Sequence, residues 1–264
     1  MMNTRPSFSG IAMATLYIGL LVLCSGATFV VGRSATRSEL AQPAAEDNTE
    51  LDALLKVFGP SRNSQYAEEW IVRDFFGGER GGVFVDVGAN HHQRFSNTFY
   101  LETKLGWSGV AIEPQTKFAE GYTRYRPRTT FVPLFVSDVS NREATLYVSE
   151  NDLVSSSSRT FTESFGSAAT PTRATTTTLD DILSRLRVPR IDFLTIDIEL
   201  AEPQALAGLS LNRFRPRLVC IEAHLPVRQQ ILDYFARHGY VLLGKYWRAD
   251  DANFWFAPLQ PESR

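Results

Sequence analysis

Acidic side chains stand at the ends of several apolar runs in this sequence, where they are able to bind hydroxyl groups, take up protons or ligate cations. Because parallel strands end at one edge of a sheet, acids that follow such runs converge on one crevice. The positions of interest are Asp86, Glu113, Asp138, Asp197, Glu199, Glu222 and His224. We treat them as one candidate site, because the set is more specific than any single member.

The segment FVDVGAN, residues 84–90, is the first part of this site. Gly88 permits a tight turn and a close backbone approach to a ligand. The glycines of a pyrophosphate-binding loop do not follow it, which argues against a dinucleotide. Glu113 lies somewhat farther along than the ~20 residues usual for the acid of a dinucleotide fold, and its carboxylate suits a ribose diol. The structural alternatives are a plain turn beside a capped Asp86 and a solvent-exposed Glu113.

The later acids form a second group. One residue separates Asp197 from Glu199, and one separates Glu222 from His224. In a strand, such pairs point to the same side. If the two strands are neighbours, the four groups meet and act either as a general base for a hydroxyl or amine, or as a Mg²⁺- or Mn²⁺-type site. The alternative is a structural cluster neutralised by arginines; the candidates are Arg190, Arg213 and Arg217.

Apolar runs alternate with segments of helical periodicity, which predicts a mostly parallel, doubly wound α/β sheet covered on both faces. The predicted strands are Val83–Val87, Gly109–Ile112, Thr130–Val136, Glu143–Val148, Asp192–Ile198, Arg217–Ala223, Tyr240–Trp247 and Asn253–Ala257. The predicted helices are Asn63–Phe76, Phe95–Leu105, 116–122, Leu179–Leu186, Pro203–Leu209 and 227–235. No helix separates the last two strands, so we expect an antiparallel C-terminal hairpin.

A segment rich in Ser and Thr, Val154–Thr178, separates the two groups of acids. Its low hydrophobicity predicts a flexible loop, which in enzymes often serves as a lid or determines specificity. Plain disorder is the alternative. The TLDD sequence that begins at Thr178 is typical of a helix N-terminus.

Residues Ile11–Gly32 are uncharged and apolar over a length sufficient to cross a bilayer. We interpret them as a single-pass membrane anchor; a signal peptide cleaved near Ser25 is the alternative. The balance of Arg5 against Arg33 and Arg37 places the following domain in the cytoplasm. The predicted organisation is an anchor at 1–33, a linker at 34–50, a globular domain at 51–258 and a tail at 259–264.

The composition limits the functions open to the chain. It has 264 residues and a formal net charge of −2, which gives no electrostatic basis for nonspecific nucleic-acid binding. Its two cysteines exclude a disulfide scaffold and a Cys-rich zinc site. Nucleic acid is therefore not an expected partner, and the partner classes left open are a membrane and a small-molecule, glycan or lipid-linked compound.

Taken together, the motifs resemble those of FkbM-family methyltransferases. The resemblance covers most of Ser64–Pro258 and keeps the motif order. It is carried by FVDVGAN, SNT, GWSGVAIEP, TLDDIL, IDFLTIDIELAEPQALAGL and RPRLVCIEAH. It implies a Rossmann-like class I methyltransferase fold and S-adenosylmethionine as the methyl donor.

The resemblance also implies roles for individual residues. Asp86, Gly88 and Asn90 would line the methionine end of the donor. Glu113 would hold the ribose, and Asp138 would lie on the adenine side. The residues that would face the acceptor are Asp197, Glu199 and Glu222.

The sequence departs from the family pattern in two places. His91 and His92 follow GAN where many members have a glycine, and Leu200 stands where many have Gly after Asp-x-Glu. We expect Leu200 to reshape the acceptor side and the histidines to lie in a solvated loop or at the mouth of the crevice. The SNT and LGWSG motifs also resemble the branch that includes Star-type membrane proteins, which implies a trafficking or binding role.

Two functional hypotheses follow. The first is a membrane-anchored, S-adenosylmethionine-dependent methyltransferase that acts on a hydroxyl of a sugar, a lipid-linked compound or a secondary metabolite. Asp197, Glu199, Glu222 and His224 would then supply the base or hold a divalent metal. The second is a membrane-tethered binding or trafficking protein on a methyltransferase fold that has lost catalysis. A different nucleoside in the same crevice is a third alternative.

Overall fold

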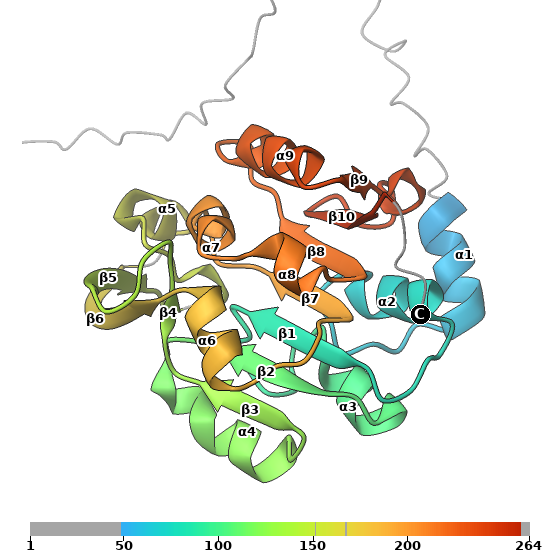
Figure 1. Cartoon of the computed structure of the whole chain (residues 1–264), viewed down its shortest axis with the longest axis horizontal. Coiled ribbons are helices and arrows are strands. Elements are labelled where there is room, and N and C mark those ends of the chain that lie inside the picture. Colours follow the sequence, from blue (N-terminus) through green and yellow to red (C-terminus); the bar gives the residue numbers. More distant parts are fainter. Residues whose placement is uncertain (1–48, 151, 167, 260–264) are drawn as a thin grey trace, which may run out of the picture. The chain divides into compact units, whose positions relative to one another are not determined.

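A seven-stranded sheet forms the centre of the domain, with strand order β3-β2-β1-β7-β8-β10-β9 (Figure 1). The structure is a computed structural model that describes residues 49–150, 152–166 and 168–259. The strands are β1 Val83–Val87, β2 Ser108–Ile112, β3 Thr129–Val132, β7 Phe193–Ile196, β8 Leu218–Glu222, β9 Tyr240–Leu242 and β10 Asn253–Pro258. The pairs from β3 to β8 are all parallel, which confirms the predicted mostly parallel sheet.

Helices cover both faces of this sheet. One face is covered by α6 Leu179–Arg185, α7 Glu202–Ala207, α8 Leu211–Phe214 and α9 Arg228–Arg237. The other face is covered by α1 Thr49–Phe58, α2 Glu68–Phe76 and α3 Phe99–Leu105. Along β1, Val85 and Val87 pack in the first core and Phe84 packs in the second. A strand buried on both sides explains the unbroken apolar run in the sequence.

The strand order reverses between β1 and β7, because the chain runs outward from β1 through β2 to β3 and then returns to place β7 on the other side of β1. Open α/β sheets bind ligands beyond the carboxyl ends of the strands at such a point. Here the Asp197 backbone N–H donates to Val87 O at 2.9 Å, and the Gly88 N–H donates to Ile112 O at 2.9 Å. The chain segments that follow β1, β2 and β7 therefore lie side by side.

The C-terminal strands are antiparallel, as predicted. β10 lies between β8 and β9 and is antiparallel to both. The pairing sets Asn253 opposite Glu222, so β10 also contributes to the edge where the acids lie. β9 ends at Leu242, earlier than predicted, because a 3₁₀ turn at Gly244–Tyr246 follows it.

A second, three-stranded sheet lies beside the first. The sequence predicted its strand Glu143–Val148 but did not predict that this strand belongs to a separate sheet. The second sheet contains β4 Phe135–Val136, β5 Glu143–Val148 and β6 Thr170–Thr177, in the order β4-β6-β5. The prediction of one strand over 130–136 was wrong, since the chain leaves the main sheet after Val132. Pro133 follows directly and has no N–H with which to continue the ladder.

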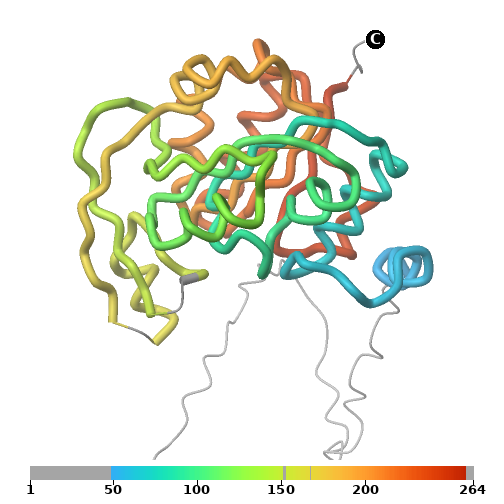
Figure 2. Tube along the Cα trace, turned by 90° about the horizontal axis from the view of Figure 1, so that it is seen from below, coloured from blue at the N-terminus to red at the C-terminus, as the bar shows by residue number. Residues whose placement is uncertain are grey.

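The prediction of a loop or disorder over Val154–Thr178 was also wrong. The segment contains α5 Arg159–Ser164 and the strand β6, which pairs antiparallel with β5. Threonine is β-branched and favours strands, and a neighbouring strand satisfies its backbone groups. Figure 2 shows this part of the chain, in yellow-green and yellow, at one side of the domain.

The predicted membrane anchor at 11–32 lies outside the described residues, as do the linker up to residue 48 and the tail from residue 260. Within the part of the chain that the structure describes, no helix has the length and apolar character needed to span a bilayer.

Candidate active site

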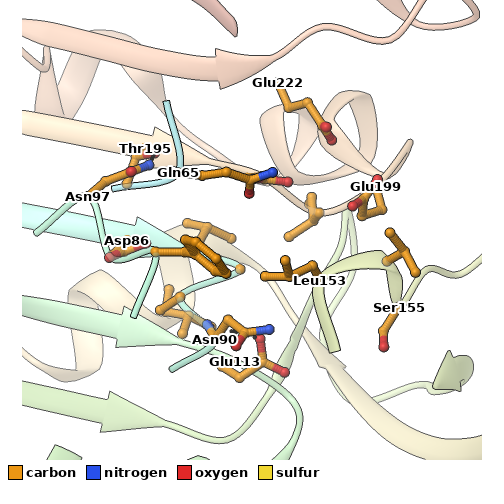
Figure 3. A pocket seen from close by; sticks show the side chains of 18 of the residues that line it. Gln65, Asp86, Asn90, Asn97, Glu113, Leu153, Ser155, Thr195, Glu199 and Glu222 are labelled. Carbon is orange, nitrogen blue, oxygen red and sulfur yellow. Dashed lines mark hydrogen bonds between the residues drawn. The ribbon is translucent and has the colours of Figure 1, made fainter. Parts of the chain in front are cut away.

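A cavity of about 410 Å³ opens at the carboxyl ends of β1, β2, β7 and β8, within the size range of small-molecule sites. Figure 3 shows Asn90 and Glu113 together on one side of it, and Glu199 and Glu222 on the opposite side. Most of the residues predicted from the sequence line it: Asp86, Gly88, Asn90, Glu113, Asp197, Glu199, Glu222 and His224. The single crevice expected from the strand ends is therefore present.

Gly88 makes the turn after β1 possible. Its φ is +84°, in the left-handed region that favours glycine. A Cβ atom at this position would lie 1.8 Å from the carbonyl oxygen of Asp197. The backbones that follow β1 and β7 thus approach each other more closely than any side chain permits, and this brings Asp86 and Asp197 to the same cavity.

Asp86 is held from behind by a buried polar network. The Thr98 hydroxyl donates to the Asp86 carboxylate at 2.8 Å, and the Arg126 guanidinium donates to Thr98 Oγ1 at 3.1 Å. Arg126 is itself buried and forms an ion pair with Glu102. Burial raises the pKa of Asp86 to about 6, and Thr98 and Arg126 oppose that shift. Thr98 belongs to the SNT motif, but no pattern in the sequence indicated that Thr98 and Arg126 hold Asp86 in place.

Glu113 follows β2 and is buried, yet it lines the cavity. Its carboxylate accepts backbone hydrogen bonds from Gln115 at 2.9 Å and from Asn90 at 3.3 Å. Burial raises its pKa to about 7, and these hydrogen bonds oppose the shift. The alternative of an exposed Glu113 is excluded.

Three other predicted positions lie elsewhere. Asp138 is exposed, accepts a hydrogen bond from Ser137 at 3.1 Å and does not line the cavity. The reason is that β4, which precedes it, belongs to the second sheet. His91 stacks on His92, which stacks in turn on Tyr125, and neither histidine lines the cavity.

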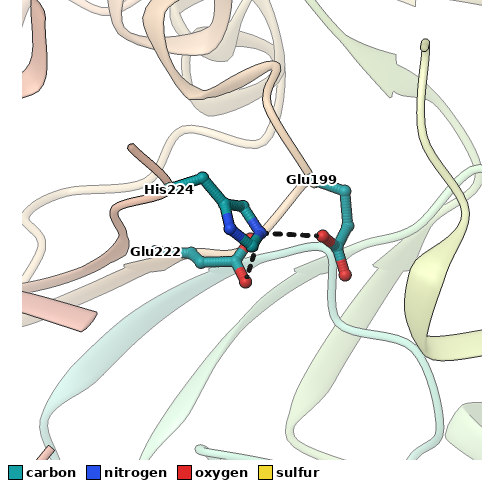
Figure 4. A group of neighbouring side chains, drawn as sticks. All are labelled: Glu199, Glu222 and His224. Atoms are coloured by element: carbon teal, nitrogen blue, oxygen red, sulfur yellow. Dashed lines mark hydrogen bonds and ion pairs between the residues drawn. The ribbon is translucent and has the colours of Figure 1, made fainter. Parts of the chain in front are cut away.

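Glu199, Glu222 and His224 form a compact group (Figure 4). His224 Nε2 lies 3.2 Å from Glu199 and 3.0 Å from Glu222. The predicted alternative of arginine neutralisation is wrong: Arg190 and Arg217 pair with Asp192, and Arg213 donates to Ser184. The histidine takes the place of those arginines.

The electrostatics of this group follow from burial and crowding. The hydrogen bonds that His224 makes with Glu199 and Glu222 raise the pKa of its ring to about 10, so the ring is an imidazolium at neutral pH. Burial raises the pKa of Glu199 to about 7. Asp197 is exposed toward the cavity, but the protein around it displaces much of its water. This desolvation, and then the charge of Glu222, raises its pKa well above the usual value.

The same three groups could ligate a divalent cation, because one ligand atom from each lies within 4.8 Å of the others. A metal would have to displace the proton of His224, since only a neutral imidazole binds a metal. The imidazolium already supplies a positive charge between the two carboxylates. The same three side chains are therefore suited to proton transfer when His224 is protonated and to metal binding when it is neutral.

The loop after β7 is strained where it carries Glu199. Glu199 and Leu200 have φ values of +56° and +79°, which are uncommon for residues other than glycine. The Ser156 hydroxyl donates to Glu199 O at 2.5 Å and ties this loop to the segment that precedes α5. Because β7 ends at Ile196, this loop conformation, rather than strand alternation, orients Glu199. The role of Ser156 was missed, since nothing in the sequence relates two positions so far apart.

The fold and the cavity define an α/β protein with an acid-rich ligand site at the switch point of its sheet. A family model described as a methyltransferase FkbM domain matches residues 86–242, more than half of the chain. The chain belongs to this family, as the sequence motifs predicted.

Two solved structures are similar to the chain. A TehB-like SAM-dependent methyltransferase from Corynebacterium glutamicum is 14% identical, with 80% of this chain and 95% of that chain covered and a TM-score of 0.41. A putative RNA methyltransferase from Pyrococcus horikoshii is 12% identical, with 81% and 98% covered and a TM-score of 0.38. No curated protein matches the chain.

The raised pKa values predict how stability depends on pH. Glu113 and Glu202 titrate near 7 in the folded protein against 4.5 for an ordinary Glu, so the folded state holds their protons more tightly than the unfolded state. His224 titrates near 10 against 6.5. All three shifts make the ligand-free protein less stable as pH rises from about 5 to 9.

We expect the free energy of unfolding, measured by urea denaturation, to fall over that range, by at most about 1.4 kcal/mol for each unit by which folding raises a pKa. Glu202 is fully buried and does not line the cavity. The Glu202→Gln variant should therefore show a smaller decrease between pH 5 and 7. A stability that rises with pH over this range would contradict the prediction.

Proposed function

We propose that this chain is an S-adenosylmethionine-dependent methyltransferase that methylates a hydroxyl group of a sugar, a lipid-linked compound or a secondary metabolite. One observation carries the proposal: a single cavity joins the acids after β1 and β2 to the acid–histidine group after β7 and β8. A donor on the first side and an acceptor on the second would meet within it. Membership of the FkbM methyltransferase family supports this interpretation.

The donor side fits a nucleoside that carries positive charge. When bound, S-adenosylmethionine supplies a methyl group on a sulfonium sulfur. Glu113 is suited to the ribose, because its oxygens reach the cavity while two backbone N–H groups fix their direction. Asp86, Gly88 and Asn90 would contact the methionine end. The buried carboxylate of Asp86 has its position set by Thr98, so it is ready to accept hydrogen bonds from an ammonium group.

The acceptor side provides a base of suitable strength. A general base works best when its pKa is close to the operating pH, and the pKa of Glu199 is about 7. His224 is protonated at that pH and therefore acts on Glu199 and Glu222 by hydrogen bonding rather than by taking up the proton. Glu199 would accept the proton of the acceptor's hydroxyl as its oxygen takes the methyl group, and the methyl–sulfur bond would break to leave the demethylated donor as a neutral thioether. Asp197 and Glu222 would orient the hydroxyl.

Donor binding tests the first half of the proposal. Calorimetric titration of the full-length chain with S-adenosylmethionine and its demethylated product should give micromolar affinity. Asp86→Asn and Glu113→Gln should each weaken it about 10- to 100-fold, as expected for the loss of a hydrogen bond to a charged group. Asp138→Asn should leave the affinity unchanged, because Asp138 lies outside the cavity. Absence of binding by the folded protein would favour the non-catalytic alternative.

The base assignment predicts a pH profile. Once an acceptor is found, methyl transfer should increase with pH through about 7, because Glu199 must lose its proton to act. Glu199→Gln should lower kcat by at least about 100-fold while donor affinity stays within a few-fold. Exposed Glu163 on α5 offers a matched control, and Glu163→Gln should retain the activity and the profile. If the Glu199→Gln variant kept the full pH dependence of methyl transfer, a residue other than Glu199 would be the base.

The N-terminal residues 11–32 would anchor the enzyme in a membrane with the catalytic domain in the cytoplasm, where the donor is made. Reporter enzymes fused at the C-terminus, one active only in the cytoplasm and one only after export, test this orientation. The cytoplasmic reporter should be active in the membrane fraction. Activity of the exported reporter alone would place the domain away from the donor and contradict the proposal.

A further inference from the structure

The titratable side chains that line the cavity are acidic, with Tyr66 and His224 as the exceptions. Its acidic members are Glu68, Asp86, Glu113, Asp197, Glu199 and Glu222. Among the described residues, no lysine or arginine lines it. A cavity that holds several carboxyl groups and excludes basic side chains attracts positive charge and repels negative charge.

The histidine of the lining does not reverse this balance. His224 Nε2 faces both Glu199 and Glu222, so one positive charge is shared between two carboxylates. The side chain of Glu222 also interacts with the carboxyl group of Asp197. A phosphate or carboxylate placed against this group would bring a further negative charge to crowded acids.

Basic side chains close to the cavity have partners elsewhere. Arg228 donates to the backbone oxygen of Ala223 at 3.0 Å. Arg126 lies behind Asp86 and is occupied by Glu102 and Thr98. Lys117 and Arg173 line a separate hollow, next to the loop after Glu113 on the donor side of the domain. Neither faces the group formed by Glu199, Glu222 and His224. An anionic acceptor would therefore meet carboxylates without a compensating cation.

The remaining wall of the cavity suits an uncharged or cationic molecule. Tyr66, Phe95 and Phe165 line it and are among the exposed large hydrophobic residues of the domain. Phe161 contacts the edge of the His224 ring, with 5.0 Å between ring centroids. Aromatic faces bind the apolar side of a ring compound and attract cations.

From these observations we infer that the acceptor is a hydroxyl compound that is uncharged or positively charged near its reacting oxygen. This inference rests on the proposed function and narrows it. Compounds with a phosphate, pyrophosphate or carboxylate next to that hydroxyl are excluded, and these include nucleotide-linked sugars and nucleic acids. An amine next to the hydroxyl would donate to Glu222 or Asp197 and strengthen binding.

Matched sets of hydroxyl compounds test the inference directly. One set is methyl glucoside, glucosamine and glucuronic acid; a second is 4-methylphenol, tyramine and 4-hydroxyphenylacetate. Binding to the full-length chain is measured by saturation-transfer NMR with and without the demethylated donor, and methyl transfer is measured from labelled S-adenosylmethionine. The neutral and cationic members should bind or react at least about tenfold better than their anionic counterparts. An anionic member that binds or reacts as well as its neutral counterpart would overturn the inference.

Charge-removing variants show whether the cavity acids cause the preference. Glu222→Gln keeps the shape of the side chain and should reduce the preference for tyramine over 4-hydroxyphenylacetate several-fold. Glu120→Gln, on the exposed surface of α4 Ala119–Tyr125, removes the same charge outside the cavity and should leave the preference intact. A preference unchanged in Glu222→Gln, with the variant shown to be folded by its thermal unfolding, would contradict the inference.

These measurements separate the inference from the proposed function. If the chain does not bind S-adenosylmethionine, the donor titration contradicts the proposed function. The relative binding of the probes is still measured in that case, because it does not require the donor. Donor binding together with preferred binding of anionic probes would overturn the inference alone.

Discussion

The close approach of the two backbone turns after β1 and β7 is the constraint on which the site depends. Only a residue without a Cβ fits at Gly88, because the carbonyl oxygen of Asp197 occupies that space. This contact brings the end of β1, which carries the donor-side acid Asp86, next to the end of β7, which leads to the acceptor-side acids. The two functions proposed for the cavity are adjacent because these two strands are paired.

Buried acidic groups lie on both sides of the cavity, and the domain stabilises them differently on each side. Behind Asp86, Arg126 and Glu102 form a buried pair whose hydrogen bonds hold a carboxylate in place. Around Glu199, burial and the crowding of acidic groups raise the carboxyl pKa values, and the hydrogen bond from His224 opposes the rise at Glu199. The first arrangement fixes the position of a carboxylate that faces the cavity, whereas the second keeps groups near neutrality that are able to exchange protons.

The second sheet and α5 give the acceptor side its shape. The loop that carries Glu199 adopts a left-handed backbone conformation with a leucine at position 200, where glycine would be easier to accommodate. Ser156 ties the loop to the chain between β5 and β6. Strain of this kind persists when the surroundings hold it, and it concentrates at functional sites. The segment that sequence composition indicated as a loop is thus a structural support of the site.

The sequence by itself determined the parallel sheet, the antiparallel C-terminal strands and most of the acidic residues that line the cavity. It did so because hydrophobic periodicity and turn residues are local signals, and acids at strand ends converge in any sheet of this type. Only the tertiary structure decided that Asp138 lies outside the cavity, that Ser/Thr-rich residues form β6, and that Thr98, Arg126 and Ser156 support the site. Only the tertiary structure showed that His224, and not one of the arginines proposed from the sequence, pairs with Glu199 and Glu222. These outcomes depend on contacts between residues far apart in the chain, and no local pattern records which distant partner a side chain will meet.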